Sequence, residues 1–333
     1  MMFSKICVYG AGAIGGWLGT RLAQQPGVTL SVVARGATLQ QLHLHGLQLQ
    51  SGDHTLHAQA VASDQPSTLG VQDLVIVAVK APSMFEVAQH IHPLIGPNTV
   101  VMTAMNGVPW WFLHGFGGAY ANTPLQSVDP QGQIAAAIGA QHIIGCVVHA
   151  SCSLRAPAQV EHHFGNGLII GEPAGGTSMR AQALHQLLQD AGFATTLSEQ
   201  IQHDVWYKLW GNMTINPVSA LTGATADKIL NDPQVLELVS AVMLEAKAVG
   251  AAIGIAIDQQ PQDRHAVTRK LGAFKTSMLQ DVQAKRAIEL DALVGAVQEI
   301  ARMTHVPTPF TDALMGLTRL QAQELGLYPL SPA

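Results

Sequence analysis

The chain has 333 residues, a length that predicts two domains, each large enough to bury a hydrophobic core of its own. Only 12% of the residues are charged and 48% are hydrophobic, so much surface is expected to be buried, which leaves room for a homodimer interface. The net charge of -5, with no basic stripe and no run of like charges, argues against nucleic acid or an anionic membrane as a partner. Small-molecule chemistry is therefore the expected class of function.

The cysteines and histidines also narrow the choice. Cys7, Cys146 and Cys152 lie in apolar, strand-like segments without paired spacing, which favours a reducing compartment, the cytoplasm, over a disulfide framework. The opening residues hold too short an apolar run for a signal peptide, and no stretch approaches about 20 uninterrupted apolar residues. The histidines at 43–45 and 162–163 have no cysteines or carboxylates at ligand spacing, so we expect no metal site.

The first part of the chain alternates short β-branched runs with helical stretches, and Gly or Pro punctuates them. Four strand-like runs carry this pattern: KICVYG (5–10), VTLSVVAR (28–35), DLVIVAVK (73–80) and TVVMTAM (99–105). The alternation predicts an α/β domain with a doubly wound, mostly parallel sheet covered by helices on both faces. Three later runs suggest further strands, some of them antiparallel: HIIGCVVHAS (142–151), AQVEHHF (158–164) and GLIIGE (167–172).

The pattern changes near residue 200. Segments 233–253, 278–303 and 310–326 repeat apolar residues at helical spacing, with Gly or Pro at their ends and no strand-like alternation. We therefore expect a second, all-helical domain and divide the chain into 1–199 and 200–333. The sequence EPAGGTS (172–178) is a competing linker, which we interpret as a loop inside the first domain before another helix.

A glycine motif follows the first predicted strand. Gly10, Gly12 and Gly15 form G-x-G-x-x-G, and Ala13 and Ile14 fill the two positions that open the next helix. In a dinucleotide-binding domain the first glycine permits a tight turn, the second lets the backbone approach a pyrophosphate, and the third packs helix on strand. The helix N-terminus attracts the anion. The motif alone is weak, but its strand-to-helix context predicts dinucleotide binding.

The residues after the second predicted strand favour NADP over NAD. NAD-binding domains usually place an Asp or Glu about 20 residues after the glycines, where it accepts hydrogen bonds from the ribose hydroxyls. Here no acidic residue precedes Asp53, and Arg35 stands at the expected place, where it can pair with a 2′-phosphate. Lys80 ends the third of these runs, at a sheet edge where such folds bind ligands, and is a second candidate contact to the cofactor.

An unusual polar stripe lies in VWYKLWGNMTINP (205–217). Because steps of four residues drift by only about 40° on a helix, Lys208, Asn212 and Asn216 share one slanting stripe, and Pro217 is expected to end the helix. A solvent-facing stripe usually carries several Lys and Glu, whereas this one has a single cation and two short amides among bulky aromatic residues. Such groups need partners, which a bound polar substrate can supply.

A second polar cluster lies in TSMLQDVQAKRAIELDAL (276–293). Ser277 with Gln280 has the capping-box pattern, which predicts that Ser277 caps a helix. Glu289 follows twelve residues later and is expected within the same helix. By spacing alone, Ser277 is a cap and Glu289 a surface acid, and the two do not share a face.

These motifs together resemble the ketopantoate reductase family over nearly the whole chain. The resemblance is carried by GAGAIG, VVARG, VKAP, MNGVP, KLWGNMTINP and TSMLQDVQAKRAIE. Lys-x-x-x-Asn-x-x-x-Asn-Pro, followed by Ser-Met-x-x-Asp and a Glu twelve residues after the Ser, is the specific part. It implies an NADPH-binding Rossmann domain followed by a helical domain like that of 6-phosphogluconate dehydrogenases.

The resemblance also implies roles for single residues. Lys208 matches the catalytic lysine and Glu289 its partner acid, with hydride passing from NADPH to the carbonyl carbon of a 2-keto acid. Residues that match the positions holding the hydroxy-acid substrate are Asn212, Asn216 and Ser277. Asn106 matches an asparagine at the nicotinamide end that is also placed to contact substrate, and Arg35 and Lys80 match adenosine-phosphate contacts. For Asn106, the preference of Asn-Gly for tight turns is an alternative explanation.

The sequence departs from the family pattern near the expected substrate site, so the pattern does not determine which 2-keto acid is the substrate. Many members continue with a small residue after Asn106-Gly107, whereas Pro109, Trp110 and Trp111 add bulk here, and Thr276 stands where a second serine is usual. The substrate is then ketopantoate or a branched or aromatic 2-keto acid. Two alternatives stay open: a 3-hydroxyacid dehydrogenase of the same superfamily, which typically has Gly where this chain has Asp204, and a redox-sensing NADP-binding module without turnover.

Overall fold

The computed structural model describes residues 3–330 and divides into two compact units. One unit takes the chain up to Met105 together with Gly132–Asp204, and the other takes Asn106–Gln131 and the chain from Val205 onward. The chain therefore passes from one unit to the other three times. Residues 106–131, which lie between two strands in the sequence, belong to the helical unit. The assignment of nucleotide binding to 1–199 and catalysis to 200–333 stays a prediction.

The first unit is built on one ten-stranded sheet. Its strands are β1 (Lys5–Tyr9), β2 (Thr29–Val33), β3 (Leu47–Ser51), β4 (His54–Ala58), β5 (Val61–Ser63), β6 (Leu74–Val77), β7 (Val100–Ala104), β8 (Ile143–Ala156), β9 (Gln159–Gly171) and β10 (Ala194–Leu197). They follow the order β4-β3-β9-β8-β7-β6-β1-β2-β5, with β10 beside β9. The stretch from β5 to β8 is parallel throughout, and the pairs β8–β9 and β3–β4 are antiparallel. The predicted parallel-rich sheet with added antiparallel strands is confirmed, although the two runs near residues 158–172 form the single long strand β9.

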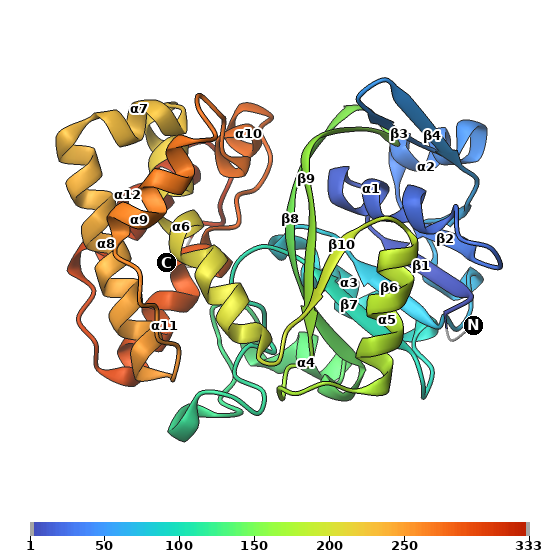
Figure 1. Ribbon diagram of the computed structural model, residues 1–333, viewed down its shortest axis with the longest axis horizontal. Helices are drawn as coiled ribbons and strands as arrows, with labels where there is room; N and C mark the ends of the chain where they lie inside the picture. Colours follow the sequence, from blue (N-terminus) through green and yellow to red (C-terminus); the bar gives the residue numbers. More distant parts are fainter. Residues whose placement is uncertain (1–2, 331–333) are drawn as a thin grey trace. The chain divides into compact units, whose positions relative to one another are not determined.

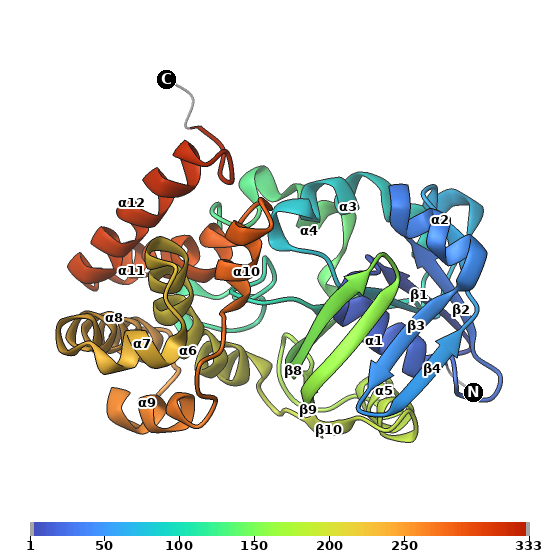
Figure 2. The same cartoon turned by 90° about the horizontal axis from the view of Figure 1, so that it is seen from above.

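Helices cover both faces of this sheet, as expected. They are α1 (Ala13–Leu22), α2 (Gly36–His45), α3 (Met84–His90), α4 (Gln133–Ala137) and α5 (Met179–Asp190). Figure 2 shows α3 and α4 on the face opposite to α1 and α5. The long strands β8 and β9 curve (green in Figure 1), and α1 packs against β3, β4, β8 and β9 as well as β1, so the sheet curls around this helix.

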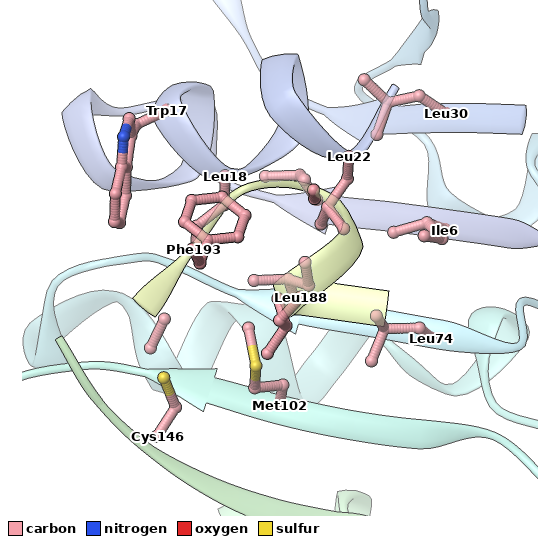
Figure 3. Packing of buried hydrophobic residues seen from close by; sticks show 14 of the residues in the cluster. Ile6, Trp17, Leu18, Leu22, Leu30, Leu74, Met102, Cys146, Leu188 and Phe193 are labelled. Atoms are coloured by element: carbon pink, nitrogen blue, oxygen red, sulfur yellow. The ribbon is translucent and has the colours of Figure 1, made fainter. Parts of the chain in front are cut away.

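The core of this unit forms where α1 and α5 pack against the sheet (Figure 3). Trp17, fully buried on α1, meets the edge of Phe193 with ring centroids 4.8 Å apart. Leu18 and Leu22 of the same helix are also fully buried. Because α1 carries the glycine motif at its first turn, this packing fixes the position of that turn against the sheet.

The second unit is helical. Its helices are α6 (Ile201–Thr222), α7 (Ala226–Asn231), α8 (Pro233–Ala252), α9 (Pro261–Arg269), α10 (Ser277–Gln283), α11 (Ala296–Thr304) and α12 (Pro309–Glu324), with a π-helical turn η7 (Asp291–Gly295) before α11. Residues 205–330 contain no strand, which confirms the expected all-helical character for the described part. No helix among residues 3–330 combines the length and hydropathy needed to cross a bilayer.

Three local predictions are wrong. Helix α6 does not end at Pro217 but continues to Thr222, because surrounding packing in a buried segment compensates for the backbone hydrogen bond that a proline removes. The predicted helix over 278–303 is two helices, α10 and α11, separated by a non-helical segment and η7. Glu289 therefore does not share a helix with Ser277.

Candidate active site

The glycine loop has the geometry that the motif requires. Gly10 has φ of +99°, and a Cβ there would stand 2.6 Å from Val79 Cγ1. A Cβ on Gly15 would stand 2.0 Å from the carbonyl oxygen of Gly10, so α1 crosses the strand too closely for any other residue. Gly12 has no atom within 4 Å of its would-be Cβ and caps α1 without a side-chain hydrogen bond. Open space at an N-terminal turn, where Ala13 and Ile14 begin α1, fits a pyrophosphate.

Three side chains gather at the carboxyl end of the neighbouring strands. Arg35 follows β2 and precedes α2, and its guanidinium donates to the carboxylate of Glu86 on α3. Tyr9 ends β1, and burial, followed by the charge of Glu86, raises the pKa of its hydroxyl to about 12. Lys80 lies just after β6 and precedes the turn into α3. The sequence located Arg35 and Lys80 at this edge, but it gave no signal for Glu86, which stands 51 residues after Arg35.

Helix α6 is fixed in rotation by two buried tryptophans. The indole N–H of Trp206 donates to the carbonyl oxygen of Ala246 at 3.2 Å, and that of Trp210 donates to Met243 at 2.7 Å, both on α8. A Cβ on Gly250 of α8 would stand 2.4 Å from Trp206 Nε1. These bonds hold one face of α6 in the core, so the polar stripe lies on another face.

The polar stripe meets a segment distant in sequence. Lys208 Nζ donates to Asn106 Oδ1 at 2.8 Å, although 102 residues separate them. Asn216, which is 6% exposed, lies at 3.5 Å from Ser277 Oγ through its Nδ2. Asn212 lies half-buried between them on α6. The structure thus brings together four of the residues that the sequence selected.

The capping-box pattern predicted that Ser277 caps helix α10, and this prediction is wrong. Thr276, which is buried, caps α10 by accepting the Leu279 amide at 3.2 Å. Ser277 is instead the first residue of the helix, and its hydroxyl lies toward Asn216. The pattern failed because threonine can also cap a helix, although serine is preferred, so two adjacent hydroxyls left the register open.

Glu289 lies just before the π-helical turn and is 4% exposed, so it is a buried acid and not a surface one. That turn is joined to the segment after Asn106: the amide of Val108 donates to the carbonyl oxygen of Ala292 at 2.8 Å. Gly107 has φ of +82°, and a Cβ there would stand 2.6 Å from the same oxygen. Asn-Gly therefore forms a turn and also places Asn106 near the Glu289 segment.

The C-terminal segment holds the same π-helical turn. The hydroxyl of Tyr328 donates to Asp291 Oδ1 at 2.6 Å, and the amide of Ile288 donates to the carbonyl oxygen of Leu327 at 3.2 Å. These two bonds flank Glu289 in sequence. Burial raises the pKa of Asp291, while the Tyr328 hydrogen bond opposes that rise. No sequence pattern indicates this attachment, which joins segments 37 residues apart.

A cation from α9, Arg264, packs against the turn of α6 that carries Lys208. The guanidinium of Arg264 lies over the ring of Tyr207, 5.1 Å from its centroid. A Cβ on Gly211 would stand 2.8 Å from Arg264 Nε, so the glycine permits this approach. The sequence feature that could have indicated this contact is Gly211, a glycine within a helix rich in aromatic residues. The side chain of Arg264 contributes positive charge to this part of α6.

Both tryptophans after Asn106 are buried: Trp110 is 7% exposed and Trp111 4%. The indole N–H of Trp110 is buried and has no hydrogen-bond acceptor among residues 3–330. Phe112, fully buried, packs its ring against Trp206 of α6 with centroids 5.7 Å apart. The segment is therefore part of the core of the helical unit.

Comparison with known proteins agrees with this geometry. The family model "Ketopantoate reductase PanE/ApbA" matches residues 6–175, and the model of the family's C-terminal part matches residues 200–322. The chain belongs to the ketopantoate reductase family. A curated 2-dehydropantoate 2-reductase of Mesorhizobium japonicum is 41% identical over 324 residues, which cover 97% of this chain and 99% of the relative.

Solved structures of the ketopantoate reductase family share the fold. A Ralstonia solanacearum protein, named as a candidate ketopantoate reductase, is 53% identical with a TM-score of 0.94, covering 98% of this chain and 100% of its own. A dimeric ketopantoate reductase from Staphylococcus aureus is 21% identical with a TM-score of 0.73, covering 97% of this chain and 100% of its own. The second likeness shows the fold alone.

Proposed function

We propose that this chain reduces 2-dehydropantoate to pantoate with NADPH, with Lys208 as proton donor. The contact between Lys208 and Asn106 carries the proposal. It places an ammonium on a rigid helix beside an amide from a segment anchored to the turn after Glu289. Family membership supports the same reaction.

The side chains divide the work as follows. The ammonium of Lys208 donates a proton to the carbonyl oxygen as alkoxide charge develops, and Asn106 holds its Nζ in place. Glu289 orients the lysine and the product hydroxyl. Asn212, Asn216 and Ser277 form hydrogen bonds to the hydroxy acid, with the hydroxyl of Ser277 near its carboxylate. A fixed cation that acts mainly in the transition state raises kcat more than affinity.

The cofactor is held by the other unit. Its glycine loop offers open space at Gly12 and the first turn of α1, and Arg35 and Lys80 follow β2 and β6 at the edge where open α/β sheets bind ligands, which supports their role as phosphate contacts. When bound, NADPH supplies the hydride for the carbonyl carbon.

Substrate size is proposed to depend on Trp110. Its buried indole N–H, without an acceptor in the described part of the chain, makes it the better candidate of the two tryptophans for a substrate contact. Such a contact would favour ketopantoate or a branched 2-keto acid over an aromatic one.

We propose further that the enzyme acts in the cytoplasm and as a homodimer. The low charged fraction and a dimeric member of the family support the assembly. Analytical ultracentrifugation at micromolar concentration tests it, and a purely monomeric species would reject it.

The reaction is tested by following NADPH oxidation with a panel of 2-keto acids. We expect ketopantoate to give the highest kcat/KM among ketopantoate, 2-ketoisovalerate and phenylpyruvate. A 3-hydroxyacid as the only turned-over substrate would favour the dehydrogenase alternative, and NADPH binding without any turnover would favour a sensing module.

A further inference from the structure

We propose that Glu86 sets the cofactor preference by acting in two ways. It supplies from α3 the ribose-binding carboxylate that the end of β2 lacks, and it competes with a 2′-phosphate for Arg35. The site would then accept NADH as well as NADPH, with only a modest preference for NADPH. This inference rests on the dinucleotide-binding part of the proposed function.

Glu86 lies at the sheet edge where a ribose-binding carboxylate normally stands. Strands β6, β1 and β2 are adjacent and parallel, so their carboxyl ends lie at one edge of the sheet. Tyr9 ends β1, Arg35 follows β2, and Glu86 lies in the first turn of the helix after β6. In open α/β sheets this edge binds the ligand, and the carboxylate of NAD-binding domains stands at the end of the second strand. Here an acid reaches the same edge from the next connection.

The ion pair with Arg35 makes Glu86 a competitor of the 2′-phosphate. The guanidinium and the carboxylate form an ion pair whose side chains are 66% and 45% exposed. An exposed pair of this kind contributes only up to about a fivefold factor to an equilibrium constant. Arg with phosphate forms stronger, charge-assisted hydrogen bonds. A 2′-phosphate can therefore displace Glu86 from Arg35, and breaking the ion pair lowers the affinity for NADPH only modestly.

The hydroxyl of Tyr9 lies within the field of both charges. The charge of Glu86 raises its pKa and that of Arg35 lowers it. The phenol is thus a neutral neighbour of the ion pair at the same edge. It adds a donor and acceptor that either form of the ribose can use.

The two roles of Glu86 have opposite consequences for the two cofactors. With NADPH, the carboxylate faces the negative 2′-phosphate and holds its partner arginine, so it weakens binding. With NADH, the carboxylate accepts hydrogen bonds from the ribose hydroxyls, so it strengthens binding. Removal of this single charge should therefore help one cofactor and harm the other.

The test compares Glu86→Gln with a matched control in the full-length protein without substrate. Dissociation constants for NADPH and NADH are measured by quenching of tryptophan fluorescence and by calorimetry. Asp64→Asn is the control, because Asp64 is exposed and directly follows β5, which pairs with β2. It removes the same charge from the same edge without removing the partner of Arg35.

We expect Glu86→Gln to tighten NADPH about three- to tenfold and to weaken NADH by a similar factor, while Asp64→Asn changes both less than twofold. In an Arg35→Ala background, the gain for NADPH should fall below about threefold. A ratio of the two dissociation constants unchanged within twofold in Glu86→Gln would overturn the inference, and so would an equal response to Asp64→Asn. If neither dinucleotide binds the parent protein, the inference and the proposed cofactor both fail. Binding that follows the expected pattern without ketopantoate turnover would sustain Glu86 and reject the proposed reaction.

Discussion

The two units position their candidate site residues in different ways. In the sheet unit, the glycine loop, Arg35 and Lys80 follow the ends of adjacent parallel strands, so a strand pattern alone locates them. In the helical unit, the candidate catalytic residues come from four segments, at residues 106, 208–216, 277 and 289, that only tertiary packing brings near one another. The sheet edge is thus a site made by topology, and the helical site is one made by side-chain packing. Substitution of the proposed proton donor in the helical unit should therefore have a larger effect than substitution of one cofactor contact at the sheet edge.

The largest effect is expected at Lys208. Lys208→Ala should lower kcat by about 10² to 10⁴, because a positioned proton donor contributes about that factor. NADPH binding should persist, since the residues proposed to contact its phosphates, Arg35 and Lys80, lie in the sheet unit. Steady-state kinetics with a separate binding titration measure both. Activity within about threefold of the parent would remove Lys208 from the mechanism.

At the sheet edge, Arg35→Ala should weaken NADPH by roughly 10- to 150-fold and leave NADH nearly unchanged. The reason is the loss of charge-assisted hydrogen bonds worth about 1.5 to 3 kcal/mol. Equilibrium binding of both cofactors measures it. An equal loss for NADPH and NADH would place Arg35 away from the 2′-phosphate.

A smaller effect, on substrate preference, is expected for Trp110 but not for Trp111. Trp110→Ala should shift kcat/KM toward phenylpyruvate and away from ketopantoate by roughly tenfold, near the lower end of what one methylene-sized change in fit gives. Trp111→Ala is the matched control and should change stability more than preference. Unchanged preference in both folded variants would show that this segment does not set specificity.

The smallest effect concerns Asp291 and appears as a dependence of stability on pH. Because burial raises its pKa in the folded state, the contribution of Asp291 to stability is fully present below the ordinary Asp value and is lost as pH rises through the raised value. Asp291→Asn should remove this slope. Tyr328→Phe should cost about 1 kcal/mol and steepen the slope, because the hydrogen bond that lowers the pKa is lost. Urea unfolding at several pH values between 4 and 7 tests this, and parallel curves for all three proteins would contradict it.

The sequence predicted most of the fold because its signals are local. The β-branched runs, the glycine motif and the helical spacing of 233–253 and 310–326 each depend on neighbouring residues, and each was confirmed. Pro217 and the break after α10 were missed, because buried packing outweighs local propensity there. The short strands β3, β4, β5 and β10 were not expected, since polar residues interrupt them; β3 and β4 form a local hairpin, whereas β5 and β10 pair with strands distant in sequence.

The same distinction applies to the candidate site. The Lys208 stripe was visible because its members are four residues apart on one helix. The partners Glu86 and Tyr328 were not visible, because each interaction spans dozens of residues with no periodic pattern. The hydrogen bond between Lys208 and Asn106 was not predicted, because 102 residues separate them; resemblance to the family assigned both to the site but named Glu289 as the partner of the lysine.

The triple passage of the chain between units also bears on how the protein is made. Residues 106–131 leave the ribosome before the helices that bury them, and Phe112 meets its partner Trp206 only after some 90 further residues are added. At a synthesis rate of about 5 to 20 residues per second, this apolar segment stays without its native neighbours for on the order of ten seconds. During that interval it is a natural target for chaperones and for self-association. A fragment that stops at the end of the sheet unit would carry the same exposed segment permanently, and deletion of 106–131 should make that fragment more soluble.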